Sequence, residues 1–449
     1  MKDLLQQLFH TTKAKDFTKL FREIEKRCEN PEVFLTEVTS YLPSRLYERY
    51  YQETIPHSFF GLISAHTAQS LFPENQRWRP FAQQCWFATQ EQKRTPLTIK
   101  KTQTKTVASY EDRWLRFIDA TVEHNFSRIL QETKGFLTET TGRDFFRKKS
   151  LLYAMEDNSY GGHKFIYLYQ AWSLAEALEW RNTEEILTPA LHFLTVAPRD
   201  ESLAKTIREI WNRNSLPSQH QFAKNTGEIS LELYQETETT LLFNHDLEHS
   251  FSLLATLASS GVSLQEVQDT LILIAAQSLS NSDTGLWIWP MRAFHFSYMS
   301  QQLVDWDPSE KTFALLMSAA LLNRASIDSC DVKENRTLDE VAQQLCPVDP
   351  MNVLKSVISH SDPHASATAI HTILGIKDNG QKELFQTLLS QAVKNDGKEC
   401  YGHDLLYVYE AFDCYGRCRL EEKNKLAISA GYFLGRVNKR YELFGAYGF

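Results

Sequence analysis

Apolar residues recur at helical spacing along nearly the whole of this 449-residue chain, and no other feature restricts the fold as strongly. Between residues 112 and 137, for example, a bulky apolar side chain returns every three or four positions. Strand-like alternation is scarce, and 229–234 is the only segment that favours a strand. The pattern predicts an all-α fold, a large multi-helix array. Helices are expected over residues 31–41, 112–137, 163–172, 176–187, 203–211, 264–279, 311–322, 338–345, 381–394 and 420–437.

Three polar stretches, 91–106, 216–228 and 324–337, interrupt the apolar periodicity and indicate loops or linkers. They would divide the chain near residues 100, 220 and 330. The apolar segments never thin out for long, however, so two organisations stay open. One is a single helical body over residues 1–449. The other has an N-terminal helical half, 1–220, and a C-terminal helical half, 221–449.

Composition excludes several classes of partner. The net charge of −8 argues against nucleic acid, because phosphate binding needs a clustered positive surface. No apolar run approaches the roughly 20 residues that a membrane-spanning helix needs, and the amphipathic start of the chain lacks the apolar core of a signal peptide. Seven scattered cysteines without a Cys-x-x-Cys pair indicate reduced thiols. We expect a cytoplasmic protein with no nucleic-acid or membrane partner; the oligomeric state is not indicated.

One phrase occurs twice, 240 residues apart, as Gly-His-Lys-Phe-Ile-Tyr-Leu-Tyr-Gln-Ala-Trp from Gly162 and Gly-His-Asp-Leu-Leu-Tyr-Val-Tyr-Glu-Ala-Phe from Gly402. The glycine, the histidine, both tyrosines and the alanine match. Each copy therefore places one histidine, His163 or His403, at the start of a very apolar helix. The separation is far longer than the roughly 20–50 residues of solenoid repeats, which favours two pseudo-equivalent halves.

Other histidines have similar settings, and several imidazoles that converge in the interior would bind a metal ion. His57 follows Pro56 at a helix start, and His295 lies among aromatic residues. The densest group is His360, Asp362, His364 and His371, where Ser361 or Asp362 should cap a helix that begins at Pro363. His364 and His371 would then share one face.

The sequence leaves two further questions about the histidines open. His245 and His249 are also four apart, without the His-Glu-x-x-His order of zinc proteases. Whether they or His403 join a common site is not indicated. For every histidine the competing interpretation is a structural imidazole, hydrogen-bonded within the core.

Taken in chain order, four of these settings resemble those of the questin oxidase-like family. The matching segments are His57 before Ser-Phe-Phe-Gly-Leu-Ile, His163 in His-Lys-Phe-Ile-Tyr-Leu-Tyr, His295 in Phe-His-Phe-Ser-Tyr-Met and His364 in Ser-Asp-Pro-His, so the resemblance spans roughly residues 50–415. It implies an all-helical oxygenase of secondary metabolism that cleaves anthraquinone-type rings, with a histidine-rich mononuclear iron (Fe²⁺) site and use of NADPH. A family lysine expected three residues after His364 is replaced by Ala367, and His371 or Asp362 would substitute for it.

The leading hypothesis is a non-haem metal-dependent oxygenase that acts on a small aromatic or polycyclic, anthraquinone-like metabolite with O₂. Its proposed metal ligands are His57, His163, His295 and His364, with His371 or Asp362 as a fifth. Tyr167 and Tyr169 would orient the substrate or support the ligands. The alternative is a non-catalytic helical binding or scaffold protein with structural histidines. A third hypothesis is another helical enzyme, such as a haem or flavin oxidase or a terpene-type cyclase.

Overall fold

The structure is a computed structural model that describes most of the chain in several stretches. They are residues 1–41, 57–90, 109–196, 198–214, 225–244, 246–282, 287–303, 306–329, 349–376, 380–396, 402–437, 441, 443 and 445, without the side chains of 58–60, 90, 196, 214 and 327–329. The boundaries expected near residues 100, 220 and 330 lie outside or at the edges of these stretches, so the division into halves stays a prediction.

Within the described stretches the fold is all-α, as expected, and holds 21 α-helices and no strand. The N-terminal helices are α1 (Lys2–His10), α2 (Ala14–Arg27), α3 (Pro31–Tyr41), α4 (His57–Ala68) and α5 (Arg79–Gln90). Next come α6 (Tyr110–Val122), α7 (Phe126–Phe136), α8 (Thr140–Met155), α9 (His163–Ala177), α10 (Thr183–Val196) and α11 (Ser202–Asn214).

The second half of the chain continues in the same way. It contains α13 (Leu231–Phe243), α14 (Leu247–Ser259), α15 (Leu264–Asn281), α16 (Ile288–Gln301) and α17 (Pro308–Ser329). The C-terminal helices are α19 (Pro350–Ser359), α20 (Pro363–Ile376), α21 (Gln381–Ala392), α22 (His403–Arg417) and α23 (Asn424–Arg436). No helix of the described stretches is both long enough and apolar enough to cross a bilayer.

Most expected helices are present, and the exceptions have local causes. The segment 229–234 is not a strand, because Ser230 caps α13 by accepting a hydrogen bond from the Leu233 amide. The helix expected over 112–137 is broken where His124 adopts a positive φ and Asn125 caps α7. The expected range 176–187 also contains a break, because Glu179, Trp180 and Asn182 have positive φ. The range 338–345 lies outside the described residues.

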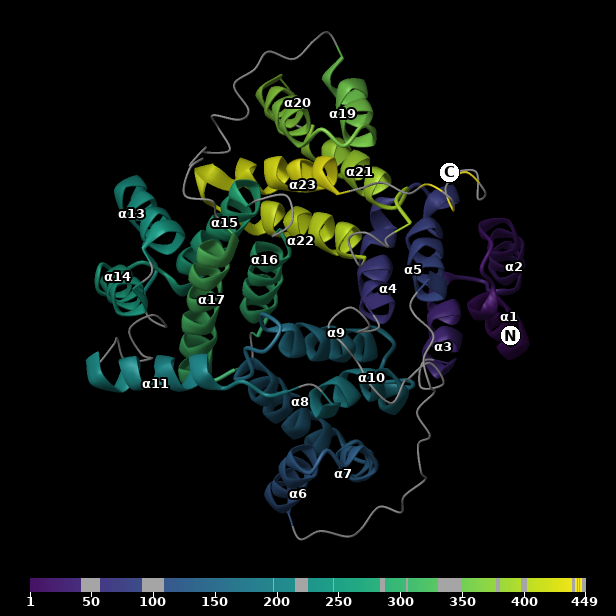
Figure 1. Ribbon diagram of the computed structural model, residues 1–449, viewed down its shortest axis with the longest axis horizontal. Coiled ribbons are helices and arrows are strands. Elements are labelled where there is room, and N and C mark those ends of the chain that lie inside the picture. Colours follow the sequence, from purple (N-terminus) through teal and green to yellow (C-terminus); the bar gives the residue numbers. More distant parts are fainter. Residues whose placement is uncertain are drawn as a thin grey trace.

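Four helices from distant parts of the chain, α4, α9, α16 and α22, pack against one another in the middle of the molecule (Figure 1). Other helices cover them: α8 and α10 pack on α9, α15 and α17 on α16, α21 and α23 on α22, and α5 on α4. Because eleven of the 15 residues of α9 are buried, that helix belongs to the core on nearly all sides. The helix α20 lies at the periphery, where it packs on α19 and α23.

Candidate metal centre

The two repeated phrases form the same local structure. Gly162 and Gly402 each precede a helix in the left-handed conformation, with φ of 77° in both. A Cβ atom on Gly162 would lie 2.7 Å from the Phe296 ring, and one on Gly402 would lie 3.1 Å from the Gln84 amide oxygen. Glycine is thus required for its backbone conformation and, at Gly162, for space. His163 and His403 follow as the first residues of α9 and α22, which confirms the expected helix starts.

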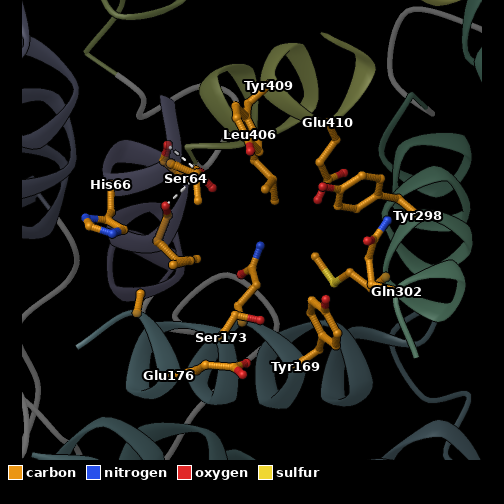
Figure 2. A pocket seen from close by; sticks show the side chains of 15 residues that line it. Ser64, His66, Tyr169, Ser173, Glu176, Tyr298, Gln302, Leu406, Tyr409 and Glu410 are labelled. Carbon is orange, nitrogen blue, oxygen red and sulfur yellow. Dashed lines mark hydrogen bonds between the residues drawn. The ribbon is translucent and has the colours of Figure 1, made fainter. Parts of the chain in front are cut away.

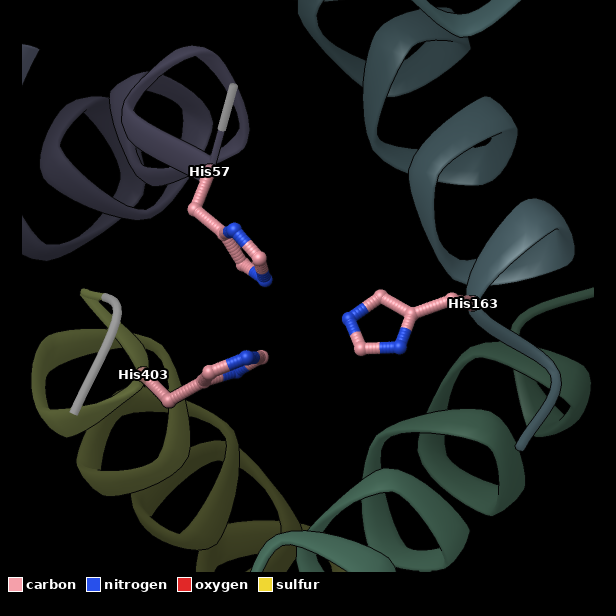
Figure 3. Close-up of side chains that lie close together, drawn as sticks. All are labelled: His57, His163 and His403. Atoms are coloured by element: carbon pink, nitrogen blue, oxygen red, sulfur yellow. The ribbon is translucent and has the colours of Figure 1, made fainter. Parts of the chain in front are cut away.

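Three buried histidines converge at the centre of the four-helix group. His57, the first residue of α4, meets His163 and His403, and the three rings face a common point (Figure 3). One ligand atom from each lies within 4.8 Å of the others. The ring centroids are 5.4–5.9 Å apart, and the three residues are 7, 1 and 4% exposed. We call His57, His163 and His403 the histidine triad.

Hydrogen bonds at Nδ1 orient two of these rings for metal binding through Nε2. The Nδ1 atom of His163 lies 3.0 Å from the Tyr160 carbonyl oxygen, to which it can only donate. The lone pair of that ring is therefore on Nε2. The Nε2 atoms of His163 and His403 have no hydrogen-bond partner among the described residues. A buried polar atom left in this state costs about 1–3 kcal/mol, which a coordinated ion would remove. The donor set thus fits a metal ion.

His295 supports the triad instead of extending it. Its Nε2 lies 3.1 Å from His403 Nδ1, and its Nδ1 lies 2.5 Å from Glu410 Oε2. If His403 binds an ion through Nε2, its Nδ1–H donates to His295, whose Nδ1–H donates to the carboxylate. Both His295 nitrogens are then occupied, so the structure places His295, expected as a ligand, behind His403 and not in the triad. A carboxylate behind a metal-binding histidine is the usual way to fix its tautomer and orientation.

The surroundings of His163 and His403 favour the neutral form of both rings. Burial lowers the pKa of His163 well below its usual value, and the Arg292 guanidinium and His57 add to this effect. Burial, followed by His295 and the other triad rings, does the same to the pKa of His403. Burial raises the pKa of Glu410, and the neighbouring His295 opposes that shift. Metal binding requires unprotonated imidazole, so these shifts favour a bound ion at neutral and mildly acidic pH.

The two tyrosines singled out in the sequence have different positions. The Tyr167 ring is buried against the triad, 5.2 Å from the His163 ring and 5.6 Å from the His57 ring. Tyr169 lies two residues along α9 and so faces the other way, into a cavity. Burial raises the pKa of the Tyr169 phenol to about 12, so it stays protonated. Tyr167 is thus placed beside the histidine triad and Tyr169 is not.

The histidines around α20 are not part of the triad. Asp362, His364 and His371 are exposed, as is His360, and we call these four residues the α20 group. Asp362 accepts a hydrogen bond from the Ala365 amide, which confirms its expected capping role. The structure does not bring His364, His371 and Asp362, which were expected as ligands, to the triad. The face of α20 that meets the core carries Ser366, Ala367 and Ile370 instead.

Of the histidines whose part in the site the sequence left open, His403 joins the triad and His249 does not. His249 is exposed on α14 and is not in the triad, while His245 lies outside the described residues. His403 does join the site. Its signal in the sequence was the repeated phrase, which gives it the same setting as His163. Glu410 carried no recognised signal, although it occupies the position in the second phrase that Gln170 has in the first.

A cavity of about 350 Å³ lies between the same four helices (Figure 2). Its lining residues come later in α4, α9 and α22 than the triad histidines, which are the first residues of these helices. Glu410 lines it, and its carboxyl group faces the cavity beside Tyr298. The cavity therefore connects to the triad through Glu410, His295 and His403. Three phenol rings and several apolar side chains contribute to the wall, whose described residues include Ile63, Tyr169, Tyr298, Met299, Leu406 and Tyr409.

Comparison with known proteins adds no relative to this picture: no protein-family model matches the chain, and neither a curated protein nor a solved structure matches it.

Proposed function

We propose that this chain is a mononuclear metal-dependent enzyme, a non-haem oxygenase, with His57, His163 and His403 as its protein ligands. The observation that carries the proposal is the histidine triad itself. Three helices, separated by long stretches of chain, bring one ligand nitrogen from each of three buried imidazoles within 4.8 Å of the others. Two of them present an Nε2 atom with no partner among the described residues. Three neutral imidazoles leave coordination positions open for reactants, as in catalytic metal sites.

The donor chemistry narrows the metal to ions that accept imidazole, namely iron, copper, nickel or zinc. Iron with open positions activates O₂, whereas zinc has no redox chemistry, and the resemblance to questin oxidase-like proteins favours Fe²⁺. The protein would hold the ion through the triad, orient His403 through His295 and Glu410, and exclude water by burial. The tyrosine-lined cavity supports an aromatic, anthraquinone-like substrate, which would stack on the rings. NADPH stays an expectation from the resemblance.

The competing hypothesis is a non-catalytic helical binding or scaffold protein whose histidines are structural. It predicts that each imidazole is satisfied by the protein itself. His295 meets that condition, because both of its ring nitrogens have partners. The Nε2 atoms of His163 and His403 do not meet it within the described stretches. The triad therefore favours the metal hypothesis.

Metal content and oxygen consumption test the proposal together. The full chain is purified from iron-supplemented cells and, separately, stripped and titrated with Fe²⁺ without oxygen. We expect about one equivalent of bound iron per chain, and oxygen uptake that depends on iron and on a hydroxylated anthraquinone, with or without NADPH. Binding below about 0.2 equivalents for every first-row ion tested would refute a metal centre. Tight binding without oxygen uptake would refute the oxygenase.

A further inference from the structure

The cavity wall contains two buried polar groups whose hydrogen bonds are not satisfied by the described residues. Glu410 uses Oε2 for the contact with His295, and its Oε1 atom has no hydrogen-bond partner in the described part of the chain. The amide nitrogen and oxygen of Gln170 also have no partner among those residues. Glu410 is 1% exposed and Gln170 is 3% exposed, and both line the cavity. Unpaired buried groups of this kind in the wall of a cavity favour a ligand that supplies the missing hydrogen bonds.

These two groups are equivalent in the repeated phrases, and so are two of the cavity tyrosines. Gln170 in the first phrase corresponds to Glu410 in the second, and Tyr169 corresponds to Tyr409. All four residues line the cavity. The repeated sequence therefore builds this cavity from two sides as well as contributing His163 and His403 to the triad. A phrase that only packed the core would not need a polar residue at this buried position of both copies.

The rest of the wall defines the shape and charge of the ligand. Tyr169, Tyr298 and Tyr409 surround the cavity with aromatic rings (Figure 2). Its described lining includes no lysine or arginine and does include Glu176 and Glu410. Glu176 is exposed and pairs with Arg147, so Glu410 is the acidic group that would repel an anionic ligand in the buried part of the cavity. The volume of about 350 Å³ lies at the lower end of the range for small-molecule sites, which suits a compact ring system.

We propose that this cavity binds a neutral, flat aromatic molecule with a phenolic hydroxyl group. The hydroxyl donates its hydrogen bond to Glu410 Oε1, and the Gln170 amide pairs with a second polar atom of the ligand or with the same oxygen. The rings stack on the cavity tyrosines. As the identity of the substrate, this inference rests on the proposed function. As a binding site, it depends only on the cavity. Glu410 then contacts both the ligand and the histidine that orients His403.

Equilibrium dialysis of the metal-free full chain with three two-ring probes tests the inference. The probes are 1-naphthol, naphthalene and 1-naphthoate, which share one ring system and differ in the polar group. We expect 1-naphthol to bind about tenfold or more tightly than naphthalene, because a hydrogen bond to a carboxylate is among the stronger ones, and 1-naphthoate to bind weakest. Equal binding of 1-naphthol and naphthalene, or no binding of either, would overturn the proposal.

Variants locate the binding and identify the polar contact. Glu410→Gln should weaken the binding of 1-naphthol by about tenfold and leave the affinity for naphthalene unchanged. Glu176→Gln is the matched control, because Glu176 also lines the cavity but is exposed and pairs with Arg147. Ala177→Trp, at the half-buried cavity wall, should abolish the binding of both probes. Equal effects of the two Glu→Gln changes would contradict the assigned contact.

Two further measurements separate this proposal from the metal proposal. If Glu410→Gln does not fold, Gln170→Leu serves in its place and should reduce the preference for 1-naphthol over naphthalene. Fe²⁺ titration of the wild-type chain is recorded independently of probe binding. Probe discrimination without metal binding would refute the proposed function and uphold the cavity as a phenol site. Metal binding without a preference for 1-naphthol over naphthalene would refute the phenol site and leave the proposed metal centre standing.

Discussion

Two regions of this molecule contain the same kinds of side chain in opposite surroundings. The α20 group has three histidines and an aspartate within residues 360–371, all exposed. The histidine triad collects one residue each from α4, α9 and α22, all buried. The exposed side chains keep their hydration and their local partners, such as the Ser356 carbonyl oxygen near His360 Nδ1. The buried ones must find partners inside the protein. Buried histidines that meet in space therefore indicate a metal site better than histidines that are close together in the sequence.

The largest expected effect comes from removing a triad ligand. His403→Ala should weaken Fe²⁺ or Co²⁺ binding by at least about a hundredfold, because even partners behind the ligands are worth about 10–100-fold. The double variant His364→Ala and His371→Ala should change affinity by less than about twofold, since exposed residues outside the triad make no bond to the ion. Competition with a chromophoric chelator measures both affinities.

The opposite result would contradict the assignment of the metal site to the triad. Loss of binding in the α20 double variant, with His403→Ala unaffected, would place the metal on the surface of α20. Circular dichroism and thermal unfolding of each metal-free variant check that the changes reflect ligand loss and not a general loss of structure.

A smaller effect is expected from the residues behind the ligand. Glu410→Gln and His295→Gln should each weaken metal binding about 10–100-fold, because His403 loses the hydrogen bonds that fix its tautomer. Asp413→Asn is the matched control, since Asp413 is one turn from Glu410 but contacts Tyr298 and Arg417 instead of His295. Co²⁺ absorption spectra would report a changed ligand geometry in the first two variants and not in the third. Equal affinities for all three would limit His295 to a packing role.

The lowered pKa values of the buried triad histidines should make the stability of the metal-free protein depend on pH. The folded-state pKa values of His163 and His403 are lowered, so the unfolded chain binds more protons below its usual histidine pKa of about 6.5. The free energy of unfolding of the metal-free protein should therefore be retained above about pH 6.5 and fall below it. Each histidine contributes up to about 1.4 kcal/mol per pH unit.

Other buried groups also change the free energy of unfolding in this pH range. The contribution of His163 and His403 is therefore measured as a difference between the wild-type protein and a variant. Burial lowers the pKa of His192 to about 4, which gives the same sign, and raises the pKa of Glu410, which gives the opposite sign. The double variant His163→Gln and His403→Gln keeps both of these contributions. Urea unfolding at several pH values should show a shallower slope for the variant between pH 6.5 and 5, and identical slopes would contradict the assignment.

The helical fold and part of the site follow from local patterns in the sequence. Apolar spacing predicts the helices, Asp362 before Pro363 predicts the start of α20, and the repeated Gly-His predicts that His163 and His403 begin helices. These features depend on residues a few positions apart. The same patterns also favoured His364 and His371, because same-face spacing on one helix says nothing about which face meets the core.

The remaining parts of the site depend on contacts between distant segments. The hydrogen bond from His295 to Glu410 spans 115 residues, and the one from His403 to His295 spans 108. A charged residue such as Glu410 in an apolar helix resembles an ordinary solvent-facing position until the packing of α16 on α22 is known. The equivalence of Gln170 and Glu410 was visible in the repeat, yet its meaning required the cavity that both residues line.

The smallest expected effects compare glycines in the two regions. Gly162→Ala should destabilise the protein by about 1–2 kcal/mol or more, because alanine must adopt a positive φ and its Cβ meets Phe296 at 2.7 Å. Gly375→Ala, in α20, should stabilise it by about 0.5–1 kcal/mol, since the residue is helical and a Cβ there meets no atom within 4 Å. Urea unfolding gives both values. Because Gly162 also positions His163, Gly162→Ala should weaken metal binding as well, whereas Gly375→Ala should not. A Gly162→Ala protein with wild-type stability and metal affinity would show that this turn does not control the position of His163.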